Sequence, residues 1–216
     1  MRLSRSDFDA AYAGGTLRLA FVGMSNIGKS FTATRLAKSH DFDLIEVDRI
    51  IWESLGQGSM ADFAAWQGQP YTDNYGPRET QSIAMETDAT RKALGLPQTD
   101  NALLDTTGSV IYTDEDVLEA LKERWLIVHI IAEEKDLERL KSDYFALPKP
   151  LIWHGHYAQQ DGMTPEESIL ACYPKLLESR GQAYRDLADV GLPSSFVLDP
   201  QTTMDAVMEL IAKQLT

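Results

Sequence analysis

Apolar residues in this chain gather in five short runs, separated by longer stretches in which apolar positions recur every three or four residues. A short apolar run between turn residues predicts a buried strand, whereas the longer spacing predicts an amphipathic helix. Alternation of the two is typical of an α/β domain. The five strands are expected at 17–22, 44–47, 102–105, 125–132 and 194–198.

Capping residues, glycines and prolines mark the ends of the expected helices. The clearest start is at Thr164, which precedes Pro165 and two glutamates, the order expected of an N-cap, a first-turn proline and an acidic first turn. Glycines at 56 and 58 divide the helical pattern over 49–66. The helices are expected at 6–13, 29–38, 49–66, 78–94, 114–124, 133–144, 164–190 and 202–215.

Residues 23–30, GMSNIGKS, fit the pattern G-x-x-x-x-G-K-[ST] between the first strand and a helix. Glycines let such a loop turn its backbone N–H groups toward phosphate oxygens, and the helix N-terminus adds its dipole. We expect Lys29 to reach the β- and γ-phosphates of ATP and the Ser30 hydroxyl to bind Mg²⁺. A glycine turn before an ordinary helix is the alternative. The predicted nucleotide-binding residues are Gly23, Met24, Ser25, Asn26, Ile27, Gly28, Lys29, Ser30 and Phe31.

Acidic residues follow the second and third expected strands. Glu46 and Asp48 end the second, and Asp105 ends the third. Ligands of open α/β sheets collect outside the carboxyl ends of the strands, so we expect Glu46 and Asp48 to face the phosphates. An acid after an apolar strand that follows a P-loop indicates a Mg²⁺ ligand, direct or through water. Asp105 could instead cap its turn.

Two loop regions have the composition of substrate-binding segments. The loop at 68–77 and the following helix form a candidate acceptor-binding flap, in which Arg78 could clamp the acceptor or could make an exposed salt bridge. The loop at 145–157 is rich in proline, aromatic and basic residues, as is typical of a lid. His154 and His156 lack further ligands for a zinc site. His129, within an apolar run, is expected in the core.

Composition adds limits to this picture. The 216 residues are 44% hydrophobic and fit one domain, 1–216, and the net charge of −13 opposes binding to nucleic acid or anionic membranes. The single cysteine, Cys172, excludes an intrachain disulfide, and no apolar run has the roughly 18 residues of a membrane span. We therefore expect a cytoplasmic protein, as a monomer or homodimer.

The P-loop together with LIEVDRII, LLDTTGSVIY and LLESRGQAYRDLADV resembles the shikimate kinases, within the nucleoside-monophosphate-kinase-like P-loop phosphotransferases. The resemblance extends over about 17–198. It implies a three-layer α/β/α domain of the P-loop kinase fold with a five-stranded parallel sheet. It also implies an acceptor-binding region at about 49–95 and a mobile lid insertion at about 142–165.

The same resemblance implies roles for individual residues. Asp48 would contact the acceptor hydroxyl and act as its base, while Glu46 would lie near Mg²⁺. Gly108 would contact the acceptor, Arg180 would bind its carboxylate, and Lys149 would replace the lid arginine. The chain departs from the family pattern in having Glu46 in place of an aspartate, a lysine in the lid, and one glycine at 107–109 in place of three.

The resulting hypothesis is ATP-dependent transfer of the γ-phosphoryl group to a hydroxyl of a small, anionic, shikimate-like acceptor. Lys29, Asp48 and Lys149 would be catalytic, Asp48, Arg78, Gly108 and Arg180 would bind the acceptor, and Ser30, Glu46 and Asp105 would hold Mg²⁺. The alternatives are a regulatory P-loop protein with little or no kinase activity and a nucleoside or nucleotide kinase.

Overall fold

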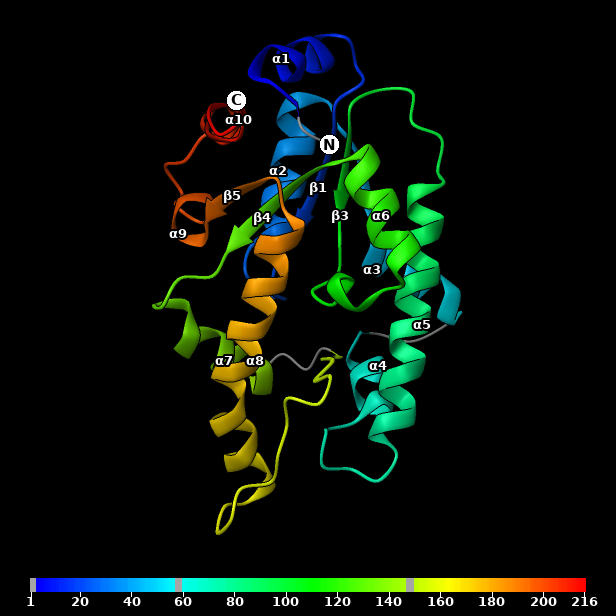
Figure 1. Cartoon of the computed structure of the whole chain (residues 1–216), viewed down its shortest axis with the longest axis vertical. Coiled ribbons are helices and arrows are strands. Elements are labelled where there is room, and N and C mark those ends of the chain that lie inside the picture. Colours follow the sequence, from blue (N-terminus) through cyan, green and yellow to red (C-terminus); the bar gives the residue numbers. More distant parts are fainter. Residues whose placement is uncertain (1–2, 57–59, 147–149) are drawn as a thin grey trace.

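A parallel sheet with helices on both faces forms the centre of the molecule (Figure 1). The computed structural model describes residues 3–56, 60–146 and 150–216. All strand pairs are parallel, and the strand order is β2-β3-β1-β4-β5. The strands are β1 (Arg18–Val22), β2 (Asp43–Glu46), β3 (Ala102–Asp105), β4 (Leu126–Ile131) and β5 (Val190–Pro193).

Helices cover both faces of the sheet, as the burial of a parallel sheet requires. Figure 1 shows α2 (Lys29–His40) behind the sheet, and α6 (Glu115–Arg124) and α8 (Pro165–Leu187) in front of it. The last helix, α10 (Met204–Lys213), packs against α2 and β5. The predicted three-layer α/β/α architecture with five parallel strands is therefore confirmed.

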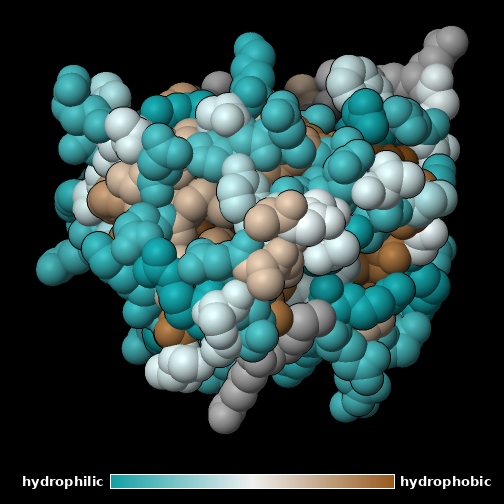
Figure 2. All heavy atoms as spheres, turned by 90° about the horizontal axis from the view of Figure 1, so that it is seen from above, coloured by the Kyte–Doolittle hydropathy of each residue, from teal (hydrophilic) through white to brown (hydrophobic). Residues whose placement is uncertain are grey.

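The remaining elements extend this framework at its two ends. Among them, α1 is tied to α10 by Arg5, which lies 2.7 Å from the carboxylate of Glu209 at the end of the molecule where both chain ends lie (Figure 1). Figure 2 shows that hydrophilic residues cover most of the molecule seen from this end. No helix in the described ranges is long and apolar enough to cross a membrane. The remaining elements are α1 (Arg5–Ala13), α3 (Val47–Leu55), α4 (Met60–Gln67), α5 (Tyr75–Leu94), the 3₁₀ helix η1 (Val110–Tyr112), α7 (Asp136–Ala146) and α9 (Ser194–Val197).

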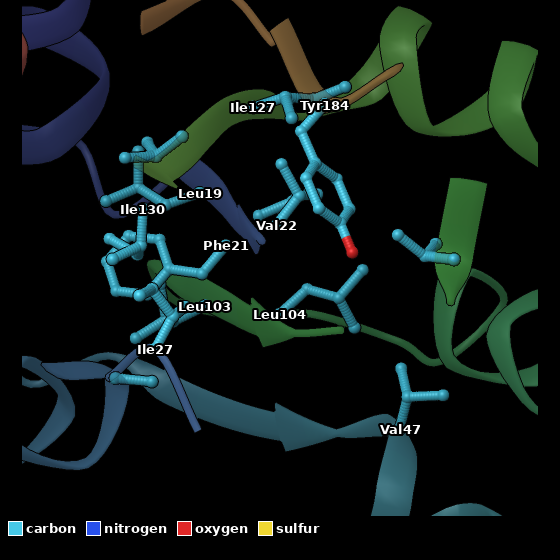
Figure 3. Packing of buried hydrophobic residues seen from close by; sticks show 14 of the residues in the cluster. Leu19, Phe21, Val22, Ile27, Val47, Leu103, Leu104, Ile127, Ile130 and Tyr184 are labelled. Carbon is cyan, nitrogen blue, oxygen red and sulfur yellow. The ribbon is translucent and has the colours of Figure 1, made fainter. Parts of the chain in front are cut away.

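The core is built from the apolar faces of the central strands. Leu19 and Phe21 of β1 and Leu103 of β3 have no exposed surface. Figure 3 shows them in one cluster with Ile27 from the P-loop and Tyr184 from α8. The phosphate-binding loop is therefore anchored to the most buried part of the sheet.

The predicted fifth strand at 194–198 is wrong. The strand lies four residues earlier, as β5, and the serines that follow it begin the short helix α9. The Glu133 carboxylate accepts a hydrogen bond of 2.8 Å from the backbone N–H of Ser195, which satisfies one of the free donors at a helix start. Because β5 begins at Val190, α8 ends at Leu187 and not at the predicted 190.

Candidate active site

The P-loop has the backbone conformation that its glycines predict. Gly23 and Gly28 have φ values of 141° and 111°, and Asn26, between them, has a φ of 62°. A Cβ atom on Gly23 would lie 2.7 Å from the carbonyl oxygen of Ile130, so only glycine fits there without a shift of the backbone. These residues place the loop between the end of β1 and the start of α2.

Lys29 and Ser30 lie in the first turn of α2, where the helix dipole favours an anion. The Lys29 side chain is buried, and its Nζ donates to the carbonyl oxygens of Gly23 at 2.9 Å and Met24 at 3.0 Å. Ser30 is exposed. The next residue, Phe31, is half exposed, and its ring lies 5.2 Å from the guanidinium carbon of Arg35. The two hydrogen bonds from Lys29 Nζ hold its ammonium group across the P-loop.

An open cavity of about 400 Å³ lies over the P-loop. It occupies the point in the sheet where the direction of the connections reverses. The chain passes from β1 to β2 at one edge of the sheet, whereas it passes from β3 to β4 toward the other edge. Ligands of open α/β sheets bind at such a point. The cavity is lined by Ser25, Asn26, Gly28, Lys29, Ser30, Phe31, Asp48, Thr106, Gly108, Asp143 and Leu198.

Glu46 and Asp105 lie side by side at the carboxyl ends of β2 and β3, where they are paired in register. Asp105 is buried, and its Oδ1 has no hydrogen-bond partner among the described residues. Burial raises the pKa of Asp105, while the charge of Lys29 and a hydrogen bond from Ser30 act in the opposite direction. A buried carboxylate oxygen without a partner fits a Mg²⁺ ion or a water bound to it.

The described residues hold no cluster of three histidine, cysteine or carboxylate side chains arranged around a metal site. Mg²⁺ in phosphoryl-transfer sites needs only one or two carboxylates, because the substrate phosphates and water complete its coordination. The Ser30, Glu46 and Asp105 oxygens therefore fit the ion that the P-loop implies, provided that nucleotide is present.

Asp48 lies in the first turn of α3, two residues after β2 ends. It lines the cavity over the P-loop and also a second, smaller cavity of about 30 Å³. Ser25 and Gly108 are shared by the two linings as well. The structure thus brings the predicted base and residues of the predicted phosphate-binding loop to the walls of the larger cavity.

Gly108 and Arg180 are in contact, but Arg180 is not at the surface of the site. Arg180 is 1% exposed, and its Nη1 and Nη2 atoms donate to the carbonyl oxygens of Gly108 at 2.9 Å and Ile152 at 2.5 Å. The Tyr184 hydroxyl also donates to the Gly108 carbonyl. In this conformation, Arg180 stabilises the turn after β3 through its hydrogen bond to the Gly108 carbonyl. Its predicted contact with an acceptor carboxylate stays a prediction.

Arg78 is not brought to either cavity. The Arg78 guanidinium carbon lies 5.8 Å from the ring centre of Trp66 on α4, and Arg78 is not among the residues that line either cavity. Lys149 lies outside the described residues. His129 is buried in β4 as expected, and burial lowers its pKa to about 4, so it is neutral near pH 7.

Glu86 of α5 is a site residue that the sequence analysis missed. It is buried and lines the smaller cavity. Its carboxylate accepts hydrogen bonds from the Ser109 hydroxyl, at 2.6 Å, and from the Thr107 hydroxyl. Burial raises the pKa of Glu86 to about 7. The available signal was its place on the buried face of α5, in the spacing of Ser82, Glu86, Ala89 and Ala93.

Part of the predicted lid is packed against α4 and α5. The Leu151 carbonyl accepts hydrogen bonds from the Tyr75 hydroxyl at 2.8 Å and from Gln67 Nε2 at 2.7 Å, and the Trp153 N–H donates to Glu79 at 2.6 Å. Trp153 is buried, and this segment passes between α5 and α8 (Figure 1). Within this segment, Pro150 and Ile152 line the smaller cavity.

No family model matches the sequence, and no curated protein matches it. Among solved structures, the shikimate kinase from Acinetobacter baumannii in complex with shikimate is similar, with a TM-score of 0.59 and 20% identity over 94% of this chain and 93% of that one. The shikimate kinase from Bacteroides thetaiotaomicron has a TM-score of 0.59 and 14% identity, over 92% of this chain and 96% of its own. The one from Aquifex aeolicus has a TM-score of 0.57 and 16% identity over the same shares.

The chain has the fold of the shikimate kinases. This likeness extends over almost the whole of each chain, which confirms the predicted shikimate-kinase-like P-loop kinase fold. At these identities the likeness is one of fold, so the substrate has to be argued from the site itself.

Proposed function

We propose that this protein transfers the γ-phosphoryl group of ATP to a hydroxyl group of a small molecule. The observation that carries the proposal is that Lys29, Ser30 and Asp48 line one cavity at the carboxyl end of the sheet. Phosphoryl transfer consists largely of holding donor and acceptor in line while charge is neutralised. The P-loop would hold the donor, ATP, and the Asp48 carboxylate in the same cavity would hold the acceptor hydroxyl.

Each part of the site has a role in this mechanism. The N–H groups of the P-loop bind the β- and γ-phosphates, and Lys29 leaves its two loop carbonyls to contact the migrating group. Asp48 orients the acceptor hydroxyl and takes its proton. Ser30, Glu46 and Asp105 would hold Mg²⁺, whose chemistry is to neutralise charge on the phosphates.

The test is ADP release from Mg-ATP by the purified protein, alone and with a panel of hydroxylated acids, sugars, nucleosides and nucleoside monophosphates. Shikimate belongs in the panel because the similar Acinetobacter baumannii enzyme is described in complex with it. We expect one class of acceptor to stimulate ADP release at least tenfold, and Lys29→Ala to abolish the stimulation. Lys38→Ala, an exposed lysine on the same helix, is the matched control.

Two outcomes would contradict the proposal. Tight ATP binding without stimulation by any member of the panel would favour a regulatory P-loop protein. Stimulation that survives Lys29→Ala would remove the P-loop from the mechanism. Stimulation by a nucleoside or its monophosphate alone would support a nucleotide kinase and would define the acceptor class.

A further inference from the structure

The smaller cavity beside the P-loop has an acidic lining. Its two charged groups are the carboxyl groups of Asp48 and Glu86, and none of the described residues that line it carries a positive charge. Ile51, Phe63 and Ile152 form apolar parts of the wall. An anionic group placed here would meet two carboxylates in surroundings of low dielectric constant, which strengthen repulsion.

The arginine expected to bind an acceptor carboxylate is engaged elsewhere. Two nitrogen atoms of Arg180 donate to the carbonyl oxygens of Gly108 and Ile152, and the side chain is almost completely buried. If Arg180 turned toward an acceptor, both carbonyls would lose a charge-assisted hydrogen bond. The observed contacts therefore favour a structural position for Arg180 over an anion-binding one.

Glu86 has acceptor capacity left over. Its hydrogen-bond donors in the described part of the chain are two neutral hydroxyls, those of Thr107 and Ser109, while the charges of Arg180 and Lys29 act on it from nearby. A carboxylate has about four acceptor sites, so about two remain. A buried carboxylate is stabilised best by a cation with N–H donors, and a protonated amine supplies both.

The volumes of the two cavities agree with such a group. The smaller cavity, at about 30 Å³, has room for a group of about the size of one water molecule, which is close to the size of an ammonium group. It shares Ser25, Asp48 and Gly108 with the cavity of about 400 Å³ over the P-loop. The larger space has room for the phosphates and for the remainder of a small acceptor.

We propose that the acceptor is a hydroxylated amine whose protonated amino group pairs with Glu86 while its hydroxyl faces Asp48. This inference rests on the proposed kinase function and differs from it in naming the substrate class. In the reaction, the hydroxyl oxygen forms a bond to the γ-phosphorus, the bond from that phosphorus to the bridging oxygen of ADP breaks, and the hydroxyl proton passes to Asp48. The amino group keeps its protons and is not phosphorylated.

The experiment compares acceptors of matched shape and different charge in the ADP-release assay. The first set is 2-amino-1,3-propanediol, glycerol and glycerate, and the second is glucosamine, glucose and glucuronate, with shikimate added. We expect the amine of at least one set to give a kcat/KM at least tenfold above those of its neutral and anionic counterparts. A neutral or anionic member that gives the highest value would overturn the inference while the kinase proposal stands. Lack of stimulation by every compound, including those of the wider panel, would overturn both.

Glu86→Gln tests the pairing directly, because the amide keeps the shape and loses the charge. We expect KM for the amine to rise at least tenfold, with kcat/KM for the neutral counterpart unchanged or higher. Asp88→Asn, an exposed carboxylate on the same helix, is the control and should change neither value. An equal loss for amine and neutral acceptors would contradict the pairing. The comparison of acceptors on the unmodified protein decides the inference even if the variant does not fold.

Discussion

Gly108 lies against Ser25 so closely that a Cβ atom on Gly108 would be 2.6 Å from the Ser25 hydroxyl oxygen and 2.9 Å from its backbone nitrogen. The turn after β3 is therefore in direct contact with the phosphate-binding loop that follows β1. Gly108 is the single glycine at 107–109, and it is at the position where the two loops meet.

Gly108→Ala should weaken nucleotide binding, because the new methyl group displaces the P-loop backbone. We expect the Kd for Mg-ATP, measured by titration calorimetry, to rise at least tenfold. Gly76→Ala is the matched control, since a Cβ atom there meets nothing within 4 Å, and it should leave the Kd unchanged. An unchanged Kd for Gly108→Ala would show that the P-loop does not depend on this contact.

Arg180→Ala should destabilise the fold, because it removes the Arg180 hydrogen bond to the buried Ile152 carbonyl and one of the two donors to the Gly108 carbonyl. We expect the free energy of unfolding in urea to fall by about 2–5 kcal/mol. Arg185→Ala, an exposed arginine on α8, should change it by less than about 0.5 kcal/mol. If stability were unchanged and only acceptor binding were lost, Arg180 would be an acceptor ligand, as the resemblance implies.

The stability of the protein should depend on the ionisation of Glu86, which lies near the charges of Asp48, Lys29 and Arg180 and accepts a hydrogen bond from Ser109. Burial raises its pKa from 4.5 to about 7 in the folded state. Between these two pH values, the folded state therefore binds more protons than the unfolded state. This contribution to stability is present below pH 4.5 and is lost as the pH rises through 7.

Glu86→Gln removes the carboxyl group whose ionisation lowers the stability of the fold. Relative to the unmodified protein, the variant should therefore gain up to about 3 kcal/mol in free energy of unfolding between pH 4.5 and pH 8. Urea unfolding of both proteins at the two pH values measures the difference. A constant difference would mean that Glu86 does not change its ionisation in this range on folding.

Local features of the sequence were enough to predict the P-loop and the strands around it. The glycines at 23 and 28 have the positive φ values that their roles require, and the acids after β2 and β3 meet because parallel strands end at one edge of the sheet. These features depend on short stretches of sequence and on the topology of α/β sheets, so they could be read without a structure.

The features that were missed depend on contacts between distant segments. The helix at 194–197 starts where Glu133, some 60 positions earlier in the chain, accepts a hydrogen bond from the Ser195 N–H. The burial of Arg180 depends on carbonyls of Gly108 and Ile152. Periodicity carries no information on such partners, and the acceptor role of Arg180 came only from the family resemblance and stays a prediction.

The central claim is that Asp48 activates the hydroxyl that receives the phosphoryl group bound by the P-loop. The measurement that tests it most directly is acceptor-stimulated ADP release by Asp48→Asn, with the phosphorylated acceptor identified by mass spectrometry. Asp43→Asn, an exposed residue of β2, is the control. If Asp48 is the general base, kcat falls at least about 100-fold for Asp48→Asn and is unchanged for the control. Retention of most of the stimulated rate by Asp48→Asn would contradict this role of Asp48.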